Sequence, residues 1–152
     1  MAEIGDFGLS IITPGSDEFN SMFDTACGTY GYVDPLYLKR GLLSRESDIY
    51  SLGVVLLEMM CGRIMDPHKN LVDLVKQYQK EGKVELVLEG IRDNIVPKSL
   101  IAFVNMACEC LHDEREKRPT PSKVVLQLKE ALKFQISFHL HYTNIHPLVF
   151  FS

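Results

Sequence analysis

The run Ser47-Asp-Ile-Tyr-Ser-Leu-Gly-Val-Val-Leu-Leu-Glu58 predicts the central helix of this chain. Ser47 is a suitable N-cap residue, and Gly62 is a suitable stop for a helix that ends at about Cys61. Apolar side chains occur nearly all round this segment, so we expect the helix to need partners on every side.

A second helix is predicted after a cap at Asn70. Its apolar residues share one face, because they are spaced by three and four positions: Leu71, Leu74, Val75 and Tyr78. A turn at Glu81 and Gly82 ends this helix, and a shorter helical piece is expected over residues 84–88.

Two more amphipathic helices follow. Pro97 opens the first, whose buried stripe is expected to be Leu100, Phe103, Val104, Ala107, Cys108 and Leu111. A polar link over residues 112–118 precedes the last helix, which Thr120 caps and Pro121 begins. Its buried face is expected to be Val124, Val125, Leu128, Ala131 and Leu132.

The two ends of the chain lack this helical periodicity. Residues 1–12 suggest a strand–turn–strand edge, residues 13–34 suggest a long loop, and residues 35–39 suggest one short turn. Residues 134–152 begin with a strand-like alternation and contain no Asp, Glu, Lys or Arg. We therefore expect a domain over residues 1–133 followed by an irregular, uncharged tail over residues 134–152.

The composition is that of one soluble, mostly helical domain, with 152 residues, 46% hydrophobic and 24% charged. A formal net charge of −4 gives no electrostatic reason to expect nucleic acid or an anionic membrane as a partner. No stretch approaches the ~18–20 continuous apolar residues of a membrane span. The four cysteines have no metal-ligand spacing, so we expect reduced thiols.

Four motifs carry more information when they are taken together. Asp6-Phe-Gly8 is followed by Gly28-Thr-Tyr-Gly-Tyr-Val-Asp-Pro-Leu-Tyr37, by the run over residues 47–58 and by Lys117-Arg-Pro-Thr120. In that order and at those distances, residues 1 to 133 resemble plant receptor-like serine/threonine protein kinases. The resemblance implies a mainly α, partial protein-kinase-like fold. It would comprise the activation segment and the last helices of the C-terminal lobe, with the N-terminal lobe and the catalytic loop absent.

The resemblance also implies a role for the first motif. Asp6 would hold Mg²⁺ against the ATP phosphates, a task that suits a carboxylate because hard cations prefer oxygen ligands. Phe7 would pack in the core, and Gly8 would let the backbone flip. Residues 9–27 would form the activation loop.

The second motif would form the substrate loop, with Gly28, Thr29, Gly31 and Tyr32 as its characteristic residues. Thr29 falls where kinases of this type contact the substrate hydroxyl, which favours serine or threonine as the target. The candidate phosphorylation sites of the activation segment are Ser21, Thr25 and Thr29.

Two further residues would have structural roles. Asp48 resembles the aspartate that receives hydrogen bonds from the catalytic-loop backbone. Arg118 resembles the arginine that pairs with a glutamate after the Asp-Pro dipeptide, but this chain has Leu36 there. We therefore expect Arg118 to turn to water or to find one of the nearby carboxylates, Asp113, Glu114 or Glu116.

The remaining kinase motifs have no counterpart in these residues. No Gly-rich loop, phosphate-binding lysine or catalytic loop precedes Asp6, so useful binding of ATP and Mg²⁺ is doubtful. Without those segments, we expect much of residues 54–57 to be exposed and Asp48 to stay in water or be desolvated without its usual donors.

Three functions stay open at this point. The chain is part of a Ser/Thr kinase that is inactive in this form, a non-catalytic module that docks on another kinase or receptor, or a decayed or wrongly assembled gene copy. The partner would be a protein substrate or a partner kinase. Full-length relatives resemble plasma-membrane receptors, which implies the cytoplasmic side for this chain.

Overall fold

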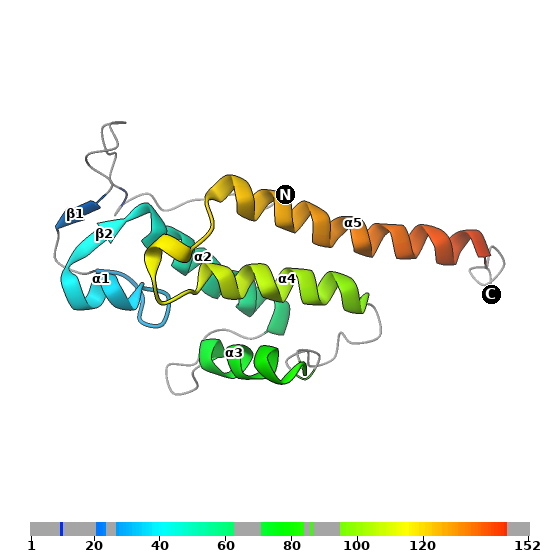
Figure 1. The fold of residues 1–152 in the computed structure, drawn as a ribbon, viewed down its shortest axis with the longest axis horizontal. Helices are drawn as coiled ribbons and strands as arrows, with labels where there is room; N and C mark the ends of the chain where they lie inside the picture. The colour runs from blue at the N-terminus through cyan, green and yellow to red at the C-terminus, as the bar shows by residue number, and fades with distance from the viewer. Residues whose placement is uncertain are drawn as a thin grey trace.

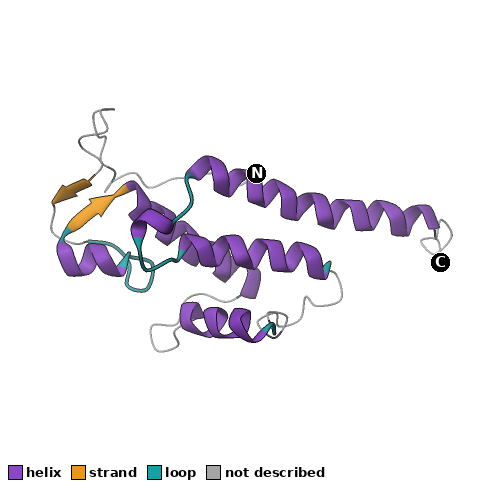
Figure 2. Ribbon diagram, viewed as in Figure 1, coloured by secondary structure: helices purple, strands orange, loops and turns teal. Residues whose placement is uncertain are grey.

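The computed structural model describes residues 10, 21–23, 27–62, 71–83, 86 and 95–145. In these ranges the protein is mainly helical, as predicted, with two short strands (Figure 2). In chain order the elements are β1 (Ser21–Phe23), α1 (Pro35–Arg40), β2 (Leu42–Ser44), α2 (Arg45–Cys61), α3 (Leu71–Glu81), α4 (Pro97–Cys110), the 3₁₀ helix η4 (Arg115–Lys117) and α5 (Pro121–Ile145). In Figure 1, α5 runs along one side of α4 and α3 lies on the other.

The strands were not predicted. β1 pairs antiparallel with β2, with Ser21 opposite Ser44 and Phe23 opposite Leu42, so the predicted loop over residues 13–34 is interrupted by a strand. Three residues are too few to show an alternating pattern, which explains why the sequence does not reveal them. The turn expected over residues 35–39 is the six-residue helix α1, and Gly41 ends it in the left-handed conformation with φ 66°.

The central helix α2 begins earlier than expected. Its N-cap is Ser44 rather than Ser47, and the backbone N–H of Ser44 donates to the Ser47 hydroxyl at 3.3 Å. Ser47 is therefore at the third helical position, where such a side chain can bond back to the cap. Cys61 and Gly62 end the helix as predicted, with Gly62 at φ 63°.

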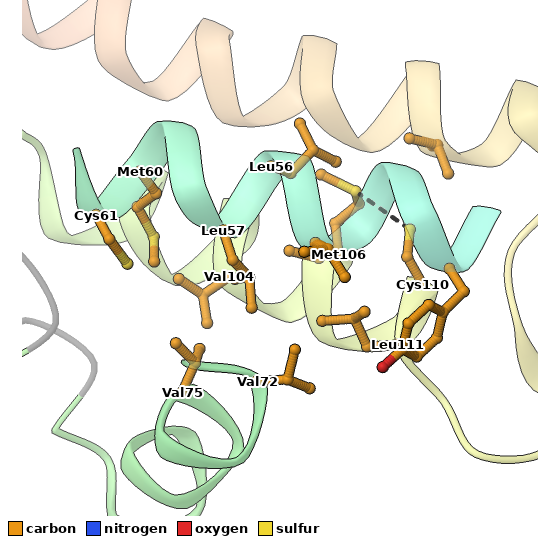
Figure 3. Close-up of a cluster of buried hydrophobic side chains, with 14 of the residues drawn as sticks. Leu56, Leu57, Met60, Cys61, Val72, Val75, Val104, Met106, Cys110 and Leu111 are labelled. Carbon is orange, nitrogen blue, oxygen red and sulfur yellow. Dashed lines mark hydrogen bonds between the residues drawn. The ribbon is translucent and has the colours of Figure 1, made fainter. Parts of the chain in front are cut away.

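The core lies where α2 meets α4 and α3 (Figure 3). Leu57 of α2, Val104 of α4 and Val75 of α3 are fully buried and belong to one hydrophobic cluster. The expected exposure of residues 54–57 is wrong, because only Val55 among them is exposed. Among the described residues α2 is not covered on every side, since Leu52, Val55 and Met59 remain exposed.

The amphipathic stripes of the later helices are partly as predicted. In α4 the predicted Leu100, Val104, Ala107 and Leu111 are buried, together with Met106 and Cys110, which the pattern missed. In α3 the buried residues are Val72 and Val75, whereas Leu74 is exposed. In α5 Val124 and Ala131 are buried, but Val125 and Leu132 are exposed. The cap predicted at Asn70 and most of residues 84–88 lie outside the described residues.

Helix α5 continues well beyond its predicted end. The strand-like alternation after Lys133 is misleading, because residues 134–145 extend the same helix. Gln135 Oε1 accepts a hydrogen bond from the Val96 N–H at 3.0 Å, and Lys98 Nζ lies 4.3 Å from the centre of the Phe134 ring. Extending an existing helix costs little compared with starting one, and no Pro or Gly occurs between Lys133 and Pro147.

The cysteines of the core are thiols, and Cys110 donates to the Met106 sulfur at 3.9 Å (Figure 3). Burial raises the pKa of Cys108 and the pKa of Cys110 to about 11. Both side chains are therefore neutral packing groups at physiological pH.

Helices α2 and α4 approach each other closely at Gly53. A Cβ atom there would lie 2.8 Å from Cys110 Cβ and 2.9 Å from Leu111 Cγ. These are core atoms that have little freedom to move, so the glycine is required by the helix–helix contact rather than by its own backbone conformation.

We expect Gly53→Ala to lower the free energy of unfolding. Overpacking costs about 1–3 kcal/mol, which outweighs a helix-propensity gain of roughly 1 kcal/mol. Urea denaturation followed by circular dichroism measures the change, with Met59→Ala on the exposed face of α2 as the control. An unchanged or raised midpoint in Gly53→Ala would contradict this packing.

Candidate functional site

The predicted substrate loop is a tight turn whose backbone conformation favours glycine at two positions. The Tyr32 N–H donates to the Thr29 carbonyl at 3.1 Å, which closes the turn. Gly28 and Gly31 have φ angles of 138° and 90°, conformations that favour glycine. A Cβ atom on Gly28 would also lie 2.6 Å from Val33 Cγ2. Thr29 is exposed at the surface of this turn.

Helix α2 holds the loop at Tyr32 by both its backbone and its side chain. The Ser51 hydroxyl donates to the Tyr32 carbonyl at 2.8 Å, and the Tyr32 hydroxyl donates to Glu58 Oε1 at 2.6 Å. A hydrogen bond to a carboxylate is stronger than one between neutral groups. The loop is thus attached to a helix that contributes many of the buried side chains of the core.

The loop ends at Asp34, a fully buried carboxylate that belongs to the second motif but for which the sequence predicted no role. Its Oδ1 accepts from the Leu36 N–H at 3.0 Å and so caps α1, while its Oδ2 accepts from the Ser47 hydroxyl at 3.1 Å. Asp34 therefore joins the start of α1 to the first turn of α2.

Arg118 forms a two-point ion pair with Asp34. Its Nη1 lies 2.9 Å from Oδ2 and its Nη2 lies 3.0 Å from Oδ1, and both side chains are almost completely buried. Arg118 also donates to the carbonyls of His112 and Glu46, each at 2.8 Å. The expectation that Arg118 turns to water or to Asp113, Glu114 or Glu116 is wrong, because its buried guanidinium pairs with Asp34.

The three carboxylates that were expected as partners of Arg118 lie elsewhere. Asp113 pairs with Lys76 at 3.2 Å, and Glu114 pairs with Lys117 at 2.6 Å. Glu116 is exposed. These acidic side chains lie at the surface of the polar link, so none of them is in the buried space that the Arg118 guanidinium occupies.

Arg115 is a second cation on the same carboxylate. Its Nε donates to Asp34 Oδ2 at 2.9 Å, and its Nη2 donates to the Leu42 carbonyl of β2 at 2.7 Å. One carboxylate thus faces two guanidinium groups, and backbone carbonyls accept further bonds from both. No sequence signal identifies Arg115, because its partner is far away in the chain.

The pKa of Asp34 reflects this balance. Burial alone would raise it, but the Arg118 hydrogen bonds, the Leu36 N–H and the Arg115 hydrogen bond outweigh burial, and the pKa falls below 3.8. The carboxylate therefore remains charged throughout the physiological range.

Asp48 differs from Asp34 in having no hydrogen-bond or ion-pair partner among the described residues. It is exposed, although partial burial still raises its pKa. It lies in the first turn of α2 and lines a cavity of about 550 Å³ with Thr29, Tyr32 and Ser51. Of the two outcomes expected for Asp48, contact with water or desolvation without its usual donors, the exposed position corresponds to the first.

The other predicted site residues are not described in full. Asp6, Phe7, Gly8 and Thr25 lie outside the described residues, and Ser21 lies in β1. Within the described ranges no group of three His, Cys, Asp or Glu side chains could hold a metal ion. No helix in those ranges is long and apolar enough to cross a membrane.

The comparisons with known proteins agree with this architecture. The family model for the protein kinase domain matches residues 1–129, so the chain belongs to the protein kinase domain family. It is 37% identical over 142 residues to Receptor-like protein kinase HERK 1 and 36% identical over 142 residues to Probable receptor-like protein kinase At5g59700, both of Arabidopsis thaliana. Each alignment covers 89% of this chain, which spans 17% of the length of each relative.

Among solved structures, the chain resembles the pseudokinase domain of BIR2, described as an immune regulator of the RLK/Pelle family. The TM-score is 0.64 at 32% identity, over 71% of this chain and 34% of that one. The predicted fold class, a partial protein-kinase-like fold, is thereby confirmed. Members of this family use ATP and Mg²⁺ and act on proteins.

We expect Asp34→Asn to destabilise the protein strongly. Asparagine keeps the shape and can still cap α1, but it leaves the buried Arg118 without its anion, at a cost of about 3–5 kcal/mol. Urea denaturation measures the loss, and Asp113→Asn, which removes an exposed partner, is the control.

In the Asp34→Asn background, Leu36→Glu should recover part of the stability. It places a carboxylate where the kinase pattern has one, close to the two arginines. If Asp34→Asn were as stable as the control, Arg118 would not depend on this ion pair.

Lowering the pH should remove the stabilisation that the charged Asp34 carboxylate provides. Because the folded-state pKa of Asp34 is lowered, its stabilisation is fully present above the unfolded pKa of about 3.8 and is lost as the pH falls through the folded value. We expect the stability difference between wild type and Asp34→Asn to shrink below about pH 4. Urea titrations at a series of pH values test this, and a constant difference would exclude it.

Proposed function

We propose that these residues form the substrate-side part of a Ser/Thr protein kinase domain. The supporting observation is the attachment of the substrate loop, which is held at Tyr32 by α2 and at Asp34 by two arginines. Thr29 is exposed in that loop, where it is available to a hydroxyl-bearing peptide or to phosphorylation. The anchor persists despite Leu36, which suggests that the loop geometry is still in use.

We also propose that the 152-residue chain by itself transfers no phosphate. Phosphoryl transfer depends on positioning and electrostatic stabilisation by several groups together. The sequence supplies one of them, Asp6, and has no Gly-rich loop or catalytic loop. ATP and Mg²⁺ should accordingly bind weakly. As in receptor-like relatives, the chain is proposed to act on the cytoplasmic side.

A second candidate is a non-catalytic module that docks on another kinase or receptor. The similarity to the BIR2 pseudokinase domain favours it, because that protein is described as a regulator. The exposed apolar side chains on α2 also favour it, since such groups commonly mark interaction sites when they form a patch.

A phosphorylation assay tests the proposal that these 152 residues by themselves transfer no phosphate. The purified chain, incubated with labelled ATP, Mg²⁺ and a generic Ser/Thr protein substrate, is expected to give no more incorporation than its Asp6→Ala variant. Clear incorporation that disappears in Asp6→Ala would show that the chain is itself an active kinase. Cooperative thermal unfolding in the same preparation would argue against a decayed gene copy.

A further inference from the structure

Three exposed cations lie around β2, at the end of the molecule that holds α1 (Figure 1). Lys39 and Arg40 are the last residues of α1, and Arg45 is the first residue of α2. Because β2 joins the two helices, Arg40 and Arg45 flank this strand and are at most about 17 Å apart along an extended backbone. We refer to Lys39, Arg40 and Arg45 as the cationic patch.

The described residues do not neutralise the charges of the cationic patch. None of its three side chains forms an ion pair within those ranges, whereas four lysines on other parts of the chain each have an acidic partner. The carboxylates of Glu46 and Asp48 follow Arg45 directly in the chain, but neither pairs with it. The charges of the patch are therefore available to a ligand.

The buried ion-pair cluster beside the patch adds to the excess of positive charge. Arg115 and Arg118 share the single carboxylate of Asp34. The Nη2 of Arg115 also donates to the Leu42 carbonyl at 2.7 Å, in the strand that separates the two ends of the patch. Two guanidinium groups on one carboxylate leave a net positive charge next to the three exposed cations.

The position of Arg45 is not explained by the stability of α2. The N-terminal end of a helix carries partial positive charge, so a cation in the first turn is unfavourable. Lys39 and Arg40, in contrast, are in the last turn of α1, where cations are favourable. An anion that spans the patch would offset the unfavourable charge at Arg45.

The backbone that carries the cationic patch is held in place. The Gly41 N–H donates to the Tyr37 carbonyl at 2.8 Å, and the Ser44 N–H donates to the Ser47 hydroxyl at 3.3 Å. A surface that is ordered before binding loses less conformational entropy when a ligand binds. Leu38 is 51% exposed next to Lys39 and offers an apolar contact at the same place.

The distribution of charge favours a short acidic segment of a protein as the ligand. The net charge of −4 becomes −7 when the three cations of the patch are set aside, so the rest of the chain repels long polyanions. Salt limits such interactions to about 10 Å, so a short segment responds mainly to the patch. Cations at both ends of a strand match several carboxylates along an extended peptide better than they match one phosphate group.

We propose that the cationic patch binds an extended segment of a partner protein that is rich in aspartate and glutamate. Carboxylates of that segment pair with Arg40 and Arg45 at the two ends of β2, and with Lys39. Because α1 directly follows the substrate loop, the bound partner is held beside Thr29. This inference goes beyond the proposed function, since binding requires neither ATP nor phosphate transfer.

Fluorescence anisotropy with an acidic peptide tests the proposal. The probe is a fluorescein-labelled peptide of about ten residues in which glutamate alternates with serine, which spans the patch when extended. At an ionic strength of about 0.05 M, where screening is modest, the wild-type chain should bind this peptide. A peptide with glutamine in place of glutamate should not bind.

Charge reversal of the patch should abolish most of this binding. The double variant with Arg40→Glu and Arg45→Glu should weaken binding at least about tenfold, because each change replaces an attraction by a repulsion. The double variant with Arg40→Gln and Arg45→Gln keeps side chains of similar length without the charges, and it should show a smaller loss. Circular dichroism checks that every variant is folded.

The matched control has the same change in net charge away from the patch. It combines Lys80→Glu with Lys129→Glu, since both lysines are exposed and lie on α3 and α5. Binding should change less than about twofold in this control, because screening separates these sites from the patch. Equal losses in the control and in the patch variant would overturn the proposal, as would equal binding of the glutamine peptide.

Two further probes distinguish the class of ligand. They are a single-stranded oligonucleotide and vesicles that contain phosphatidylserine. If either bound more tightly than the acidic peptide and lost its binding in the patch variant, the ligand would be a nucleic acid or a membrane, and the proposal would be wrong. A failure of the proposed function would instead appear in the phosphorylation assay, which does not measure this binding.

Discussion

The two hydrogen bonds between Asp34 and Arg118 connect segments that are 84 residues apart in the chain. Around them Asp34 also caps α1 and accepts from Ser47 in α2, while Arg115 reaches both Asp34 and a carbonyl of β2. Because these charged groups are buried, each depends on the others to offset its desolvation. The end of the substrate loop, the sheet and the link before α5 are therefore held by one cluster.

Helix α2 connects this cluster to the rest of the protein. On one side it binds the loop through Ser51 and Glu58, and on another it approaches α4 so closely that position 53 has no room for a side chain. The loop that would meet a protein substrate is thus supported directly by the hydrophobic core. In this fold a loop composed largely of glycine, threonine and tyrosine can have a defined shape because Tyr32 and Asp34 are both fixed to α2.

Local sequence patterns predicted where the helices lie better than they predicted which of their faces are buried. Pro97, Thr120 with Pro121, and Gly62 correctly marked helix ends, because caps and stops act through neighbouring backbone groups. The strand-like alternation after Lys133 gave the wrong prediction for residues 134–145, where α5 continues. The predicted buried face of α5 was also wrong at Val125 and Leu132, which are apolar but exposed. Periodicity identifies an apolar face, but it does not say whether another element covers it.

By itself the sequence determined the family and the order of the helices, because the ordered motifs and the capping residues are local features of the chain. Only the tertiary structure decided that Arg118 pairs with Asp34, and that Leu52, Val55 and Met59 of α2 are exposed. Both outcomes depend on which side chains meet across long separations. An ion pair between residues 34 and 118 follows from the packing of α1, α2 and the η4 link, and no spacing in the sequence encodes it.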